Sequence, residues 1–537
     1  MKTTIEPSKE QMEVIVETNN IVVTAKPGSG KTFTIVEKIK CISENLLDYQ
    51  GVIAISFTRK ASSELAARCK KRNVIKKQSF LGTIDNFYIS QIICPFAKHI
   101  TSSNVRLQVR EKLSDYPQYN ELKNIRTEVS GDLKELLIDS LREGHIFLEI
   151  SGQTALFILE SAKDCIKYLK SKYTHIFIDE YQDCGEVQHK IFLRLVEEGL
   201  VGIAVGDLDQ AIYAFSERYS KYLASLMIDC RFTHYEITKN HRCHKSISNY
   251  SLRLLNHTIS NDEKDIRVFK VKVRGNDEHI MNVIDKLLPQ IKEKYNVKNN
   301  NEIAILCRSN NTATRAHDFL TTSSKLFKTT ELDENNSYWA RVFSDILESY
   351  FDPNVFAVSF TEKYVDDEIN SKQFIMALEI IKSIFNLETE ELKNNITLFV
   401  NFARLIYPEF EDCDVLTILK RTLNDTEKLL CYKPAAENEV CIMTLHKSKG
   451  LEFKVVFHLD LYRWIFPYEY SGITEEDIIQ SLNLHYVGIT RAIEVCYMMQ
   501  GTRRYAEKKE RFVDTEESNF LHRNNLGDFR CDVDWRA

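Results

Sequence analysis

The sequence predicts an α/β protein with two parallel-sheet domains and two mainly helical insertions. Two observations predict the sheets: four short apolar segments in the first half of the chain and four more in the second half, each ending at a turn or polar residue. Continuous apolar runs of this length are typical of strands that are buried on both faces of a parallel sheet. A third observation, the amphipathic stretches between these segments, predicts the helices.

The first four apolar segments are expected to form one sheet. Helices connect successive strands of a parallel sheet, so the polar residues that follow the strands meet at a single edge. We therefore expect the chemistry of the first domain at that edge. The segments are IVVTA at 21–25, GVIAISF at 51–57, HIFIDE at 175–180 and VGIAVGD at 201–207.

The second half repeats this arrangement and indicates another sheet, with helical stretches between the two blocks. The expected strands are EIAILCR at 302–308, VCIMTL at 440–445, VVFHLD at 455–460 and VCYMMQ at 495–500. Apolar residues near helical spacing predict helices within 132–144, 371–386 and 392–407. Two polar, Asn-rich segments, 296–302 and 331–337, are expected to be turns or linkers.

Length and composition narrow the class of protein. The 537 residues predict three or four structural units, because domains usually have about 100 to 200 residues. The formal net charge of -6 excludes a polycation that binds DNA by bulk charge, so any DNA contact requires a local groove. The sequence has neither a run of about 18 uncharged apolar residues nor the layout of a signal peptide. We expect a cytoplasmic protein without membrane contact.

The cysteines do not indicate a disulfide or metal framework. The 13 cysteines are scattered, and no two form a C-x-x-C pair, so most are expected to be buried reduced thiols. The run His241-Arg242-Cys243-His244 resembles a set of zinc ligands, but no second pair of ligands lies near it in the sequence. We therefore expect no zinc site there.

The strongest motif is AKPGSGKT at 25–32, which lies between an apolar strand segment and a helical pattern. Glycines in such a loop let backbone N–H groups turn toward phosphate oxygens, and the following helix directs its positive end at the same anion. The lysine supplies a cation to the outer phosphates, and the threonine hydroxyl ligates Mg²⁺. The residues expected at the nucleotide are Gly28, Ser29, Gly30, Lys31 and Thr32.

A second motif, IFIDEYQD at 176–183, offers the acids that a nucleoside triphosphatase needs. Asp179 follows the strand and is expected to hold Mg²⁺. The adjacent Glu180 is expected to act as the general base that polarises the attacking water. A single acidic strand end can also cap a helix, but a pair of carboxylates together with a phosphate loop favours hydrolysis.

Four further motifs make the chain resemble the UvrD-like DNA helicases. They are VGDLDQAIYAF at 205–215, TKNHRCHKSI at 238–247, IMTLHKSKGLEFKVVF at 442–457 and HYVGITRAIE at 485–494. The resemblance implies two RecA-like motor domains of the P-loop NTPase class, ATP and Mg²⁺ as cofactors, and 3′-to-5′ movement along single-stranded DNA. The implied boundaries are 1–93 and 151–235 for motor domain 1A, 94–150 for insertion 1B, 236–330 and 431–537 for motor domain 2A, and 331–430 for a reduced insertion 2B.

The resemblance also implies roles at the nucleotide. Arg242 and Arg491 would approach the γ-phosphate from the second domain and neutralise charge in the transition state. Gln210 would sense that phosphate. Gln11 would hydrogen-bond the adenine edge, and Glu452 would bond the ribose. The family usually holds adenine between an Arg and a Tyr, and this chain has Phe33 and His241 at those two positions.

The expected DNA contacts lie in the same motif loops. Flat side chains can stack on bases, and hydroxyl or imidazole groups can bond the backbone. For each aromatic taken alone, core packing is an equally good interpretation. The stacking candidates are Phe57, Tyr213 and Phe215, and the backbone candidates are Thr58, Thr83, Thr444 and His446.

Three DNA-side positions depart from the family pattern. Phe215 replaces the usual Trp, Ser216 replaces an Arg, and Asp85 replaces a His. These changes remove stacking area or positive charge. ATP hydrolysis is therefore better supported by the sequence than processive unwinding.

Within the family, 80–100 and the motif-flanking residues resemble the helicase-like subunits of Gabija antiphage systems. That resemblance implies a partner, an OLD-family nuclease that carries a Toprim domain, and a role in defence against phage. Three other functions stay open: a DNA-gated nucleotidase that switches a nuclease with little unwinding, a general DNA-repair helicase, and an autonomous nuclease-helicase. The last is least favoured, since only about forty residues follow the final motif.

Overall fold

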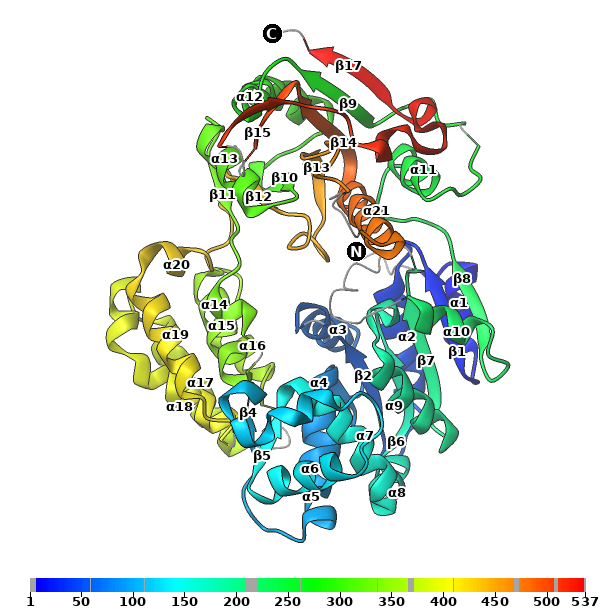
Figure 1. Ribbon diagram of the computed structural model, residues 1–537, viewed down its shortest axis with the longest axis vertical. Helices are drawn as coiled ribbons and strands as arrows, with labels where there is room; N and C mark the ends of the chain where they lie inside the picture. The colour runs from blue at the N-terminus through cyan, green and yellow to red at the C-terminus, as the bar shows by residue number, and fades with distance from the viewer. Residues whose placement is uncertain are drawn as a thin grey trace.

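The computed structural model confirms the predicted fold class, two parallel sheets with helical insertions (Figure 1). It describes residues 6–57, 59–110, 112–208, 220–260, 262–335, 337–365, 371–408, 410–467, 473–506 and 510–535. The two sheets form separate lobes, and a group of helices lies beside them. Among the described helices, none is both long enough and apolar enough to span a bilayer.

The first sheet has six parallel strands in the order β3-β2-β6-β7-β1-β8. All four segments predicted for it are strands, and β3 and β8 are additions at its two edges. The strands are β1 (Ile21–Ala25), β2 (Gly51–Ser56), β3 (Phe80–Thr83), β6 (Tyr173–Ile178), β7 (Val201–Gly206) and β8 (Thr233–Ile237). The accompanying helices are α1 (Lys9–Val16), α2 (Lys31–Ser43), α3 (Arg59–Lys71), α4 (Ile84–Phe87), α7 (Ser151–Ser161), α8 (Lys163–Lys172), α9 (Glu186–Glu197) and α10 (Lys221–Met227).

The second sheet has seven parallel strands in the order β11-β12-β10-β13-β14-β9-β17. Its four central strands are those that the sequence predicted. They are β10 (Ile303–Cys307), β12 (Val440–Thr444), β13 (Phe453–His458) and β14 (Ala492–Gly501), and they are joined by β9 (Val268–Val273), β11 (Ser324–Leu326) and β17 (Cys531–Trp535). The accompanying helices are α11 (Lys245–Leu254), α12 (Asp277–Lys294), α13 (Asn310–Phe319) and α21 (Glu475–Thr490).

Two groups of helices interrupt these sheets. Between 94 and 150, helices α5 (Cys94–Thr101) and α6 (Asp132–Arg142) accompany a short parallel pair, β4 (Gln108–Arg110) and β5 (His145–Phe147). Between 331 and 430 the described elements are helices around an aromatic core that includes Trp339, Phe343 and Phe399. These are α14 (Glu331–Glu334), α15 (Tyr338–Phe351), α16 (Ala357–Glu362), α17 (Ser371–Phe385), α18 (Ile396–Ile406), α19 (Cys413–Asn424) and α20 (Thr426–Leu430).

One prediction about local structure was wrong. The segment 331–337 was expected to be a turn or linker, but its first four residues form helix α14. The hydroxyl of Thr330 accepts a hydrogen bond from the backbone N–H of Asp333, and the Asp333 carboxylate accepts one from the Thr330 N–H in return. This reciprocal cap satisfies backbone N–H groups at the start of the helix. Leu332 is fully buried, so tertiary packing overrides the polar composition of the segment.

A buried histidine pair connects β13 to α21. The ring nitrogen Nδ1 of His458 lies 2.9 Å from the carbonyl of Leu459, which can only accept, so Nδ1 must carry the proton. His458 Nε2 is then an acceptor for Nδ1 of His485, 3.1 Å away. Both side chains are fully buried, and burial lowers the pKa of His458 to about 4 and that of His485 well below its usual value. The pair is therefore neutral in the folded protein.

The histidine pair predicts a fold that loses stability in mild acid. Because the folded pKa values lie below the unfolded value of about 6.5, the unfolded chain binds protons that the folded chain does not. The free energy of unfolding should fall as pH drops from about 6.5 toward 4, by up to about 1.4 kcal/mol per pH unit for each histidine. Urea titrations across this range measure the slope.

The double variant His458→Leu, His485→Phe should make that slope shallower, while the other buried histidines still contribute to it. His522→Gln serves as the control, since His522 is exposed. An equal slope in wild type and double variant would contradict the assignment.

Candidate active site between the two motor sheets

The phosphate loop follows the predicted strand-loop-helix pattern. β1 ends at Ala25, α2 begins at Lys31, and Gly28 and Gly30 have φ angles of 73° and 86°. Glycine tolerates this left-handed backbone, whereas other residues are strained in it. Position 28 also has no room for a side chain, because a Cβ on Gly28 would lie 2.6 Å from the Cβ of Arg242. Thr32 lies in the first turn of α2, beside Lys31.

Gln11 of helix α1 is hydrogen-bonded to the phosphate loop. Its carboxamide nitrogen donates to the carbonyl of Ser29 at 2.9 Å, and its carboxamide oxygen accepts from the N–H of Ser8 at 2.8 Å. Gln11 and Ser29 are both buried. The carboxamide that was expected to bond the adenine edge thus links α1 to the loop.

The two acids and the lysine come together at the end of β6. Asp179 is buried, and Lys31 Nζ lies 3.4 Å from Glu180 Oε2. Glu180 has a φ of 57°, an uncommon conformation for a residue other than glycine. Strained backbone of this kind is concentrated at active sites, where the surrounding structure holds it in place.

The two neighbouring carboxylates have opposite shifts in pKa. Burial and the adjacent Glu180 raise the pKa of Asp179. Burial acts in the same direction on Glu180, but Lys31 and Lys449 outweigh it and lower the pKa of that carboxyl. Glu180 is therefore ionised, as a general base must be, while the buried Asp179 carboxyl fits a site that a divalent cation would stabilise.

Gln182 is a residue of this motif that the sequence reasoning missed. Its carboxamide nitrogen donates to Glu180 Oε2, and its oxygen accepts from the N–H of Asp207 at 2.9 Å. Gln182 is fully buried and approaches Gly206 so closely that a Cβ there would lie 2.5 Å away. Glu180 is thus connected to the end of β7, where the segment containing Gln210 begins.

The connection between β8 and α11 joins the phosphate loop to the second sheet. Asn240 donates to the carbonyl of Pro27 at 3.0 Å, and the N–H of His241 donates to the carbonyl of Gly28 at 2.8 Å. From the same segment, the Cys243 thiol donates to the carbonyl of Thr490 at 3.6 Å. In the described part of the chain, no three His, Cys, Asp or Glu side chains are placed to share a metal ion.

The two predicted γ-phosphate arginines lie at this junction. Arg242 pairs with Glu452, with 2.6 Å between Nη2 and Oε1, so the residue expected at the ribose holds the residue expected at the γ-phosphate. Arg491 is buried, and it donates to the carbonyls of Val487 and Leu451 at 3.1 and 3.2 Å. Burial and Arg242 lower the pKa of Arg491 to about 10, which leaves it charged at neutral pH.

An ion pair between the sheets was not predicted. Lys449 Nζ, from the loop after β12, lies 2.7 Å from Oδ2 of Asp183, which follows β6. The exposed fractions of the two side chains are only 12% and 2%. The sequence did place Lys449 inside a helicase motif, but nothing in that motif specified its partner.

Replacing Lys449 by Met is expected to destabilise the protein by about 3 kcal/mol, because it removes one partner of a buried ion pair and leaves the other charged. Chemical unfolding measures this change. Lys454→Met is the matched control: Lys454 pairs with Glu302 at 2.9 Å, but both side chains are more exposed, so its loss should cost less than about 1 kcal/mol. Equal costs for the two variants would contradict the role given to Lys449.

Phe33, which is expected at the base, is in contact with a cation. The guanidinium of Arg72 lies 5.2 Å from the ring centre of Phe33, and its Nε lies 3.1 Å from the Glu37 carboxylate. Arg72 thus places a cation against the ring that replaces the usual Arg. The side chain of His241 is exposed beside the loop.

The structure places some of the expected DNA contacts. Thr83 Oγ1 accepts a hydrogen bond from Arg341 of α15 at 3.3 Å, and Asp85 accepts one from Ser151 at 3.3 Å. Phe57 packs partly buried against the core of the first sheet, as its core interpretation predicts. Thr58, Gln210, Tyr213 and Phe215, together with Ser216, lie outside the described residues.

A second group of expected DNA contacts lies at the carboxyl edge of the second sheet. Thr444 ends β12, and His446 follows it, half-buried. Burial, Arg308 and Lys449 lower the pKa of His446 to about 4, so its imidazole is neutral. The sequence analysis did not single out Arg308, although it is the polar last residue of the predicted strand segment 302–308.

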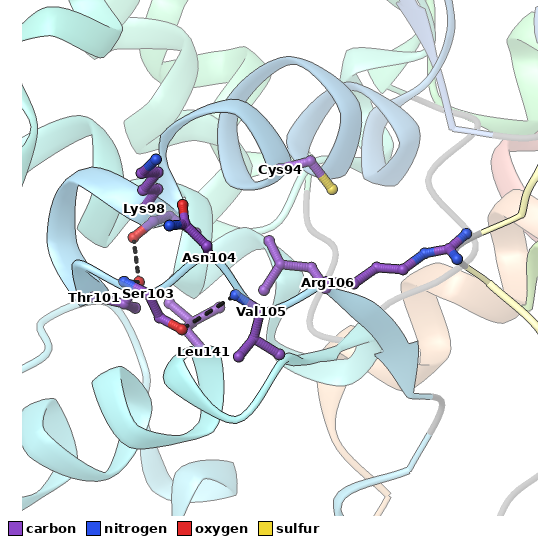
Figure 2. Close-up of a pocket in the computed structure, with 10 residues that line it drawn as sticks. Cys94, Lys98, Thr101, Ser103, Asn104, Val105, Arg106 and Leu141 are labelled. Carbon is purple, nitrogen blue, oxygen red and sulfur yellow. Dashed lines mark hydrogen bonds between the residues drawn. The ribbon is translucent and has the colours of Figure 1, made fainter.

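One pocket lies away from the predicted site. It is formed at the end of α5 and the following segment, with Lys98, Ser103, Asn104 and Arg106 among its lining residues (Figure 2). None of the predicted site residues lines it. The residues expected at the nucleotide lie instead around the loop between β1 and α2.

Comparisons with known proteins support a UvrD-like, ATP-hydrolysing DNA helicase. Residues 8–216 match the family model of an AAA domain, and residues 327–500 match that of the UvrD-like helicase C-terminal domain.

Individual relatives extend along nearly the whole chain. The chain is 28% identical to Gabija protein GajB of Bacillus cereus (strain VD045), over 93% of this chain and 96% of the relative. It is 22% identical to a probable DNA helicase II homolog of Mycoplasma pneumoniae, over 92% and 84% of the two chains. It is 21% identical to the ATP-dependent DNA helicase PcrA of Staphylococcus epidermidis, over 93% and 83%.

Proposed function

We propose that this chain is the motor subunit of a Gabija-type antiphage system. It hydrolyses ATP as it moves 3′ to 5′ along single-stranded DNA and acts with an OLD-family nuclease that carries a Toprim domain. The similarity to Gabija protein GajB along 96% of that relative supports the assignment, because it includes the segments between the motifs as well as the motifs.

The observation that best supports the motor function is that charged residues from both sheets lie together at the site. Lys31 and Glu180 come from the first sheet, and Arg242, Arg491 and Lys449 approach them from the second. Hydrolysis assigned to such a site depends on the relative position of the two sheets, since the charges that stabilise the transition state come from both. Nucleotide turnover can then drive movement between the lobes.

Each residue has a proposed role in hydrolysis. Glu180 takes the proton from the attacking water, Lys31 binds the outer phosphates, and Arg242 and Arg491 neutralise charge that develops on the γ-phosphate. Thr32 and Asp179 would hold Mg²⁺, which supplies Lewis-acid polarisation of the phosphates.

Other residues have proposed roles in recognising the nucleotide. Phe33 and His241 hold the base between them, and Gln11 bonds the edge of the base. Glu452 bonds the ribose, and Gln210 senses the γ-phosphate.

ATPase and strand-displacement assays with and without single-stranded DNA test the motor function. DNA-stimulated hydrolysis together with displacement of a strand annealed ahead of a 3′ overhang is expected. Displacement only from a 5′ overhang would overturn the polarity. Hydrolysis that is indifferent to DNA would overturn the motor assignment itself.

A second candidate function is a DNA-gated nucleotidase that switches the nuclease with little unwinding. The observation that favours it is Asp85: the family has a cation-forming His there, and this carboxylate is bonded to Ser151. DNA-stimulated hydrolysis without strand displacement would select this function over the helicase.

The partner is tested by coexpression with the products of neighbouring genes. We expect a Toprim-containing nuclease to copurify with the chain through size-exclusion chromatography. A neighbour without nuclease motifs, or a nuclease that elutes separately, would favour a general DNA-repair helicase.

A further inference from the structure

Trp464 has a conformation that is unusual for its size. It occupies the third position of a turn that is closed by the Ile465 N–H and the Tyr462 carbonyl, 3.2 Å apart, and its φ is 62°. Glycine or Asn normally fills that position, because a bulky side chain is strained at positive φ. The ring is nevertheless 44% exposed, so burial in the core does not account for the strain.

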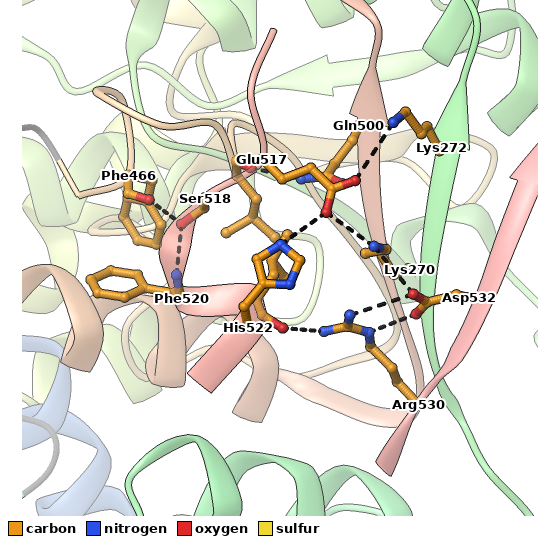
Figure 3. A network of polar contacts seen from close by, with 12 residues as sticks. Lys270, Lys272, Phe466, Gln500, Glu517, Ser518, Phe520, His522, Arg530 and Asp532 are labelled. Carbon is orange, nitrogen blue, oxygen red and sulfur yellow. Dashed lines mark hydrogen bonds and ion pairs between the residues drawn. The ribbon is translucent and has the colours of Figure 1, made fainter. Parts of the chain in front are cut away.

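The surrounding residues hold this ring in place. The guanidinium of Arg463 lies 4.6 Å from its centre and also pairs with Glu516 at 2.8 Å. Two residues further on, Phe466 is fully buried and its carbonyl accepts a hydrogen bond from Ser518 Oγ (Figure 3). The aromatic ring is therefore exposed on a rigid support rather than on a loose loop.

This turn lies at the edge of the second sheet where the DNA contacts are expected. β10, β12 and β13 are parallel, so the residues that follow them emerge at one edge. The N–H of Arg308, after β10, donates to the carboxylate of Asp460, after β13, at 2.7 Å. The charge of Arg308 also lowers the pKa of His446, which follows β12. Trp464 follows Asp460 by four residues.

We infer that Trp464 is a stacking platform for a base of single-stranded DNA. An exposed indole offers a large flat surface that any base can stack on, and such platforms are most effective when they are held rigid. The inference rests on the proposed movement along single-stranded DNA. It supplies an aromatic contact in the second motor domain, whereas the expected stacking residues Phe57, Tyr213 and Phe215 come from the first.

Two carboxylates beside the support are paired with cations. Glu516 is neutralised by Arg463. The adjacent Glu517 pairs with Lys270 at 3.1 Å and with Lys272 at 3.7 Å (Figure 3). The two carboxylates next to Ser518, which bonds the support, are therefore matched by cations.

The strained backbone makes Trp464→Gly a sharp test. Glycine removes the ring and relieves the positive φ, so the variant should unfold at the same temperature as wild type or a higher one. We expect its affinity for a fluorescent oligo(dT) strand to fall about tenfold, whereas Trp464→Phe keeps a ring and most of the affinity. Unchanged oligo(dT) affinity in the glycine variant would overturn the inference.

Intrinsic fluorescence gives a second readout. The chain has 3 tryptophans; Trp339 is fully buried, so a Trp535→Phe background leaves Trp464 as the one exposed reporter. Oligo(dT) should quench this emission, and the quenching should disappear in Trp464→Phe. Quenching that persists in Trp464→Phe would also overturn the inference. A wild-type protein whose hydrolysis ignores single-stranded DNA would instead overturn the proposed function.

Discussion

Glu180→Gln is expected to reduce ATP turnover about a thousandfold while ATP binding stays nearly unchanged. The amide keeps the size and shape of the side chain but cannot accept the proton of the attacking water, and a positioned general base contributes about a hundredfold to ten-thousandfold. Lys31 Nζ, 3.4 Å from this carboxylate, stays in place to bind phosphate. Phosphate release measures kcat, and a fluorescent ATP analogue measures the dissociation constant.

Two variants accompany that measurement. Lys31→Ala should abolish turnover and also weaken nucleotide binding strongly, because it removes the cation at the outer phosphates. Glu186→Gln changes an exposed carboxylate at the start of α9 and should leave both quantities unchanged. Wild-type turnover in Glu180→Gln would mean that another group activates the water.

Arg242→Ala is expected to lower kcat by a factor of about a thousand or more, the usual contribution of an arginine that stabilises transition-state charge in phosphoryl transfer. Arg242 approaches the phosphate loop so closely that Gly28 has no room for a Cβ, and its guanidinium pairs with Glu452 at 2.6 Å. In the nucleotide complex the guanidinium should exchange this carboxylate for the γ-phosphate. Steady-state kinetics separates the effect on kcat from that on KM.

Glu452→Ala separates catalysis from ion pairing. If the pair were only structural, loss of either partner would have the same effect. We expect Glu452→Ala to raise KM with a small change in kcat, because its proposed contact is the ribose. Arg231→Ala is the surface control, since Arg231 pairs with Asp229 and Glu197 at an exposed site. Equal losses of kcat in Arg242→Ala and Glu452→Ala would contradict the proposed role of Arg242.

Local pattern explains why most of the fold could be predicted. The eight apolar segments are strands because a continuous apolar run suits a strand that is buried on both faces of a parallel sheet. Strands at the edges of the sheets were harder to predict from the sequence. β3 and β8 are less apolar than the central strands, and β17 pairs with β9, which is distant in the chain. Segment 331–337 was assigned as a linker because its composition is polar, and its capping bonds and buried Leu332 were not visible as a pattern.

By itself, the sequence determined the strand-loop-helix unit of the phosphate loop and the position of Asp179 and Glu180 at the end of a strand. Those residues are close together along the chain, so one strand-turn-helix unit or one strand end positions them. Only the tertiary structure decided how the second sheet completes the site, since Lys449 and Asp183 are 266 residues apart and pair through the packing of two lobes. The same holds for Trp464, whose strained turn depends on contacts with 516–518. Long-range contacts of this kind leave no periodic signal in a single sequence.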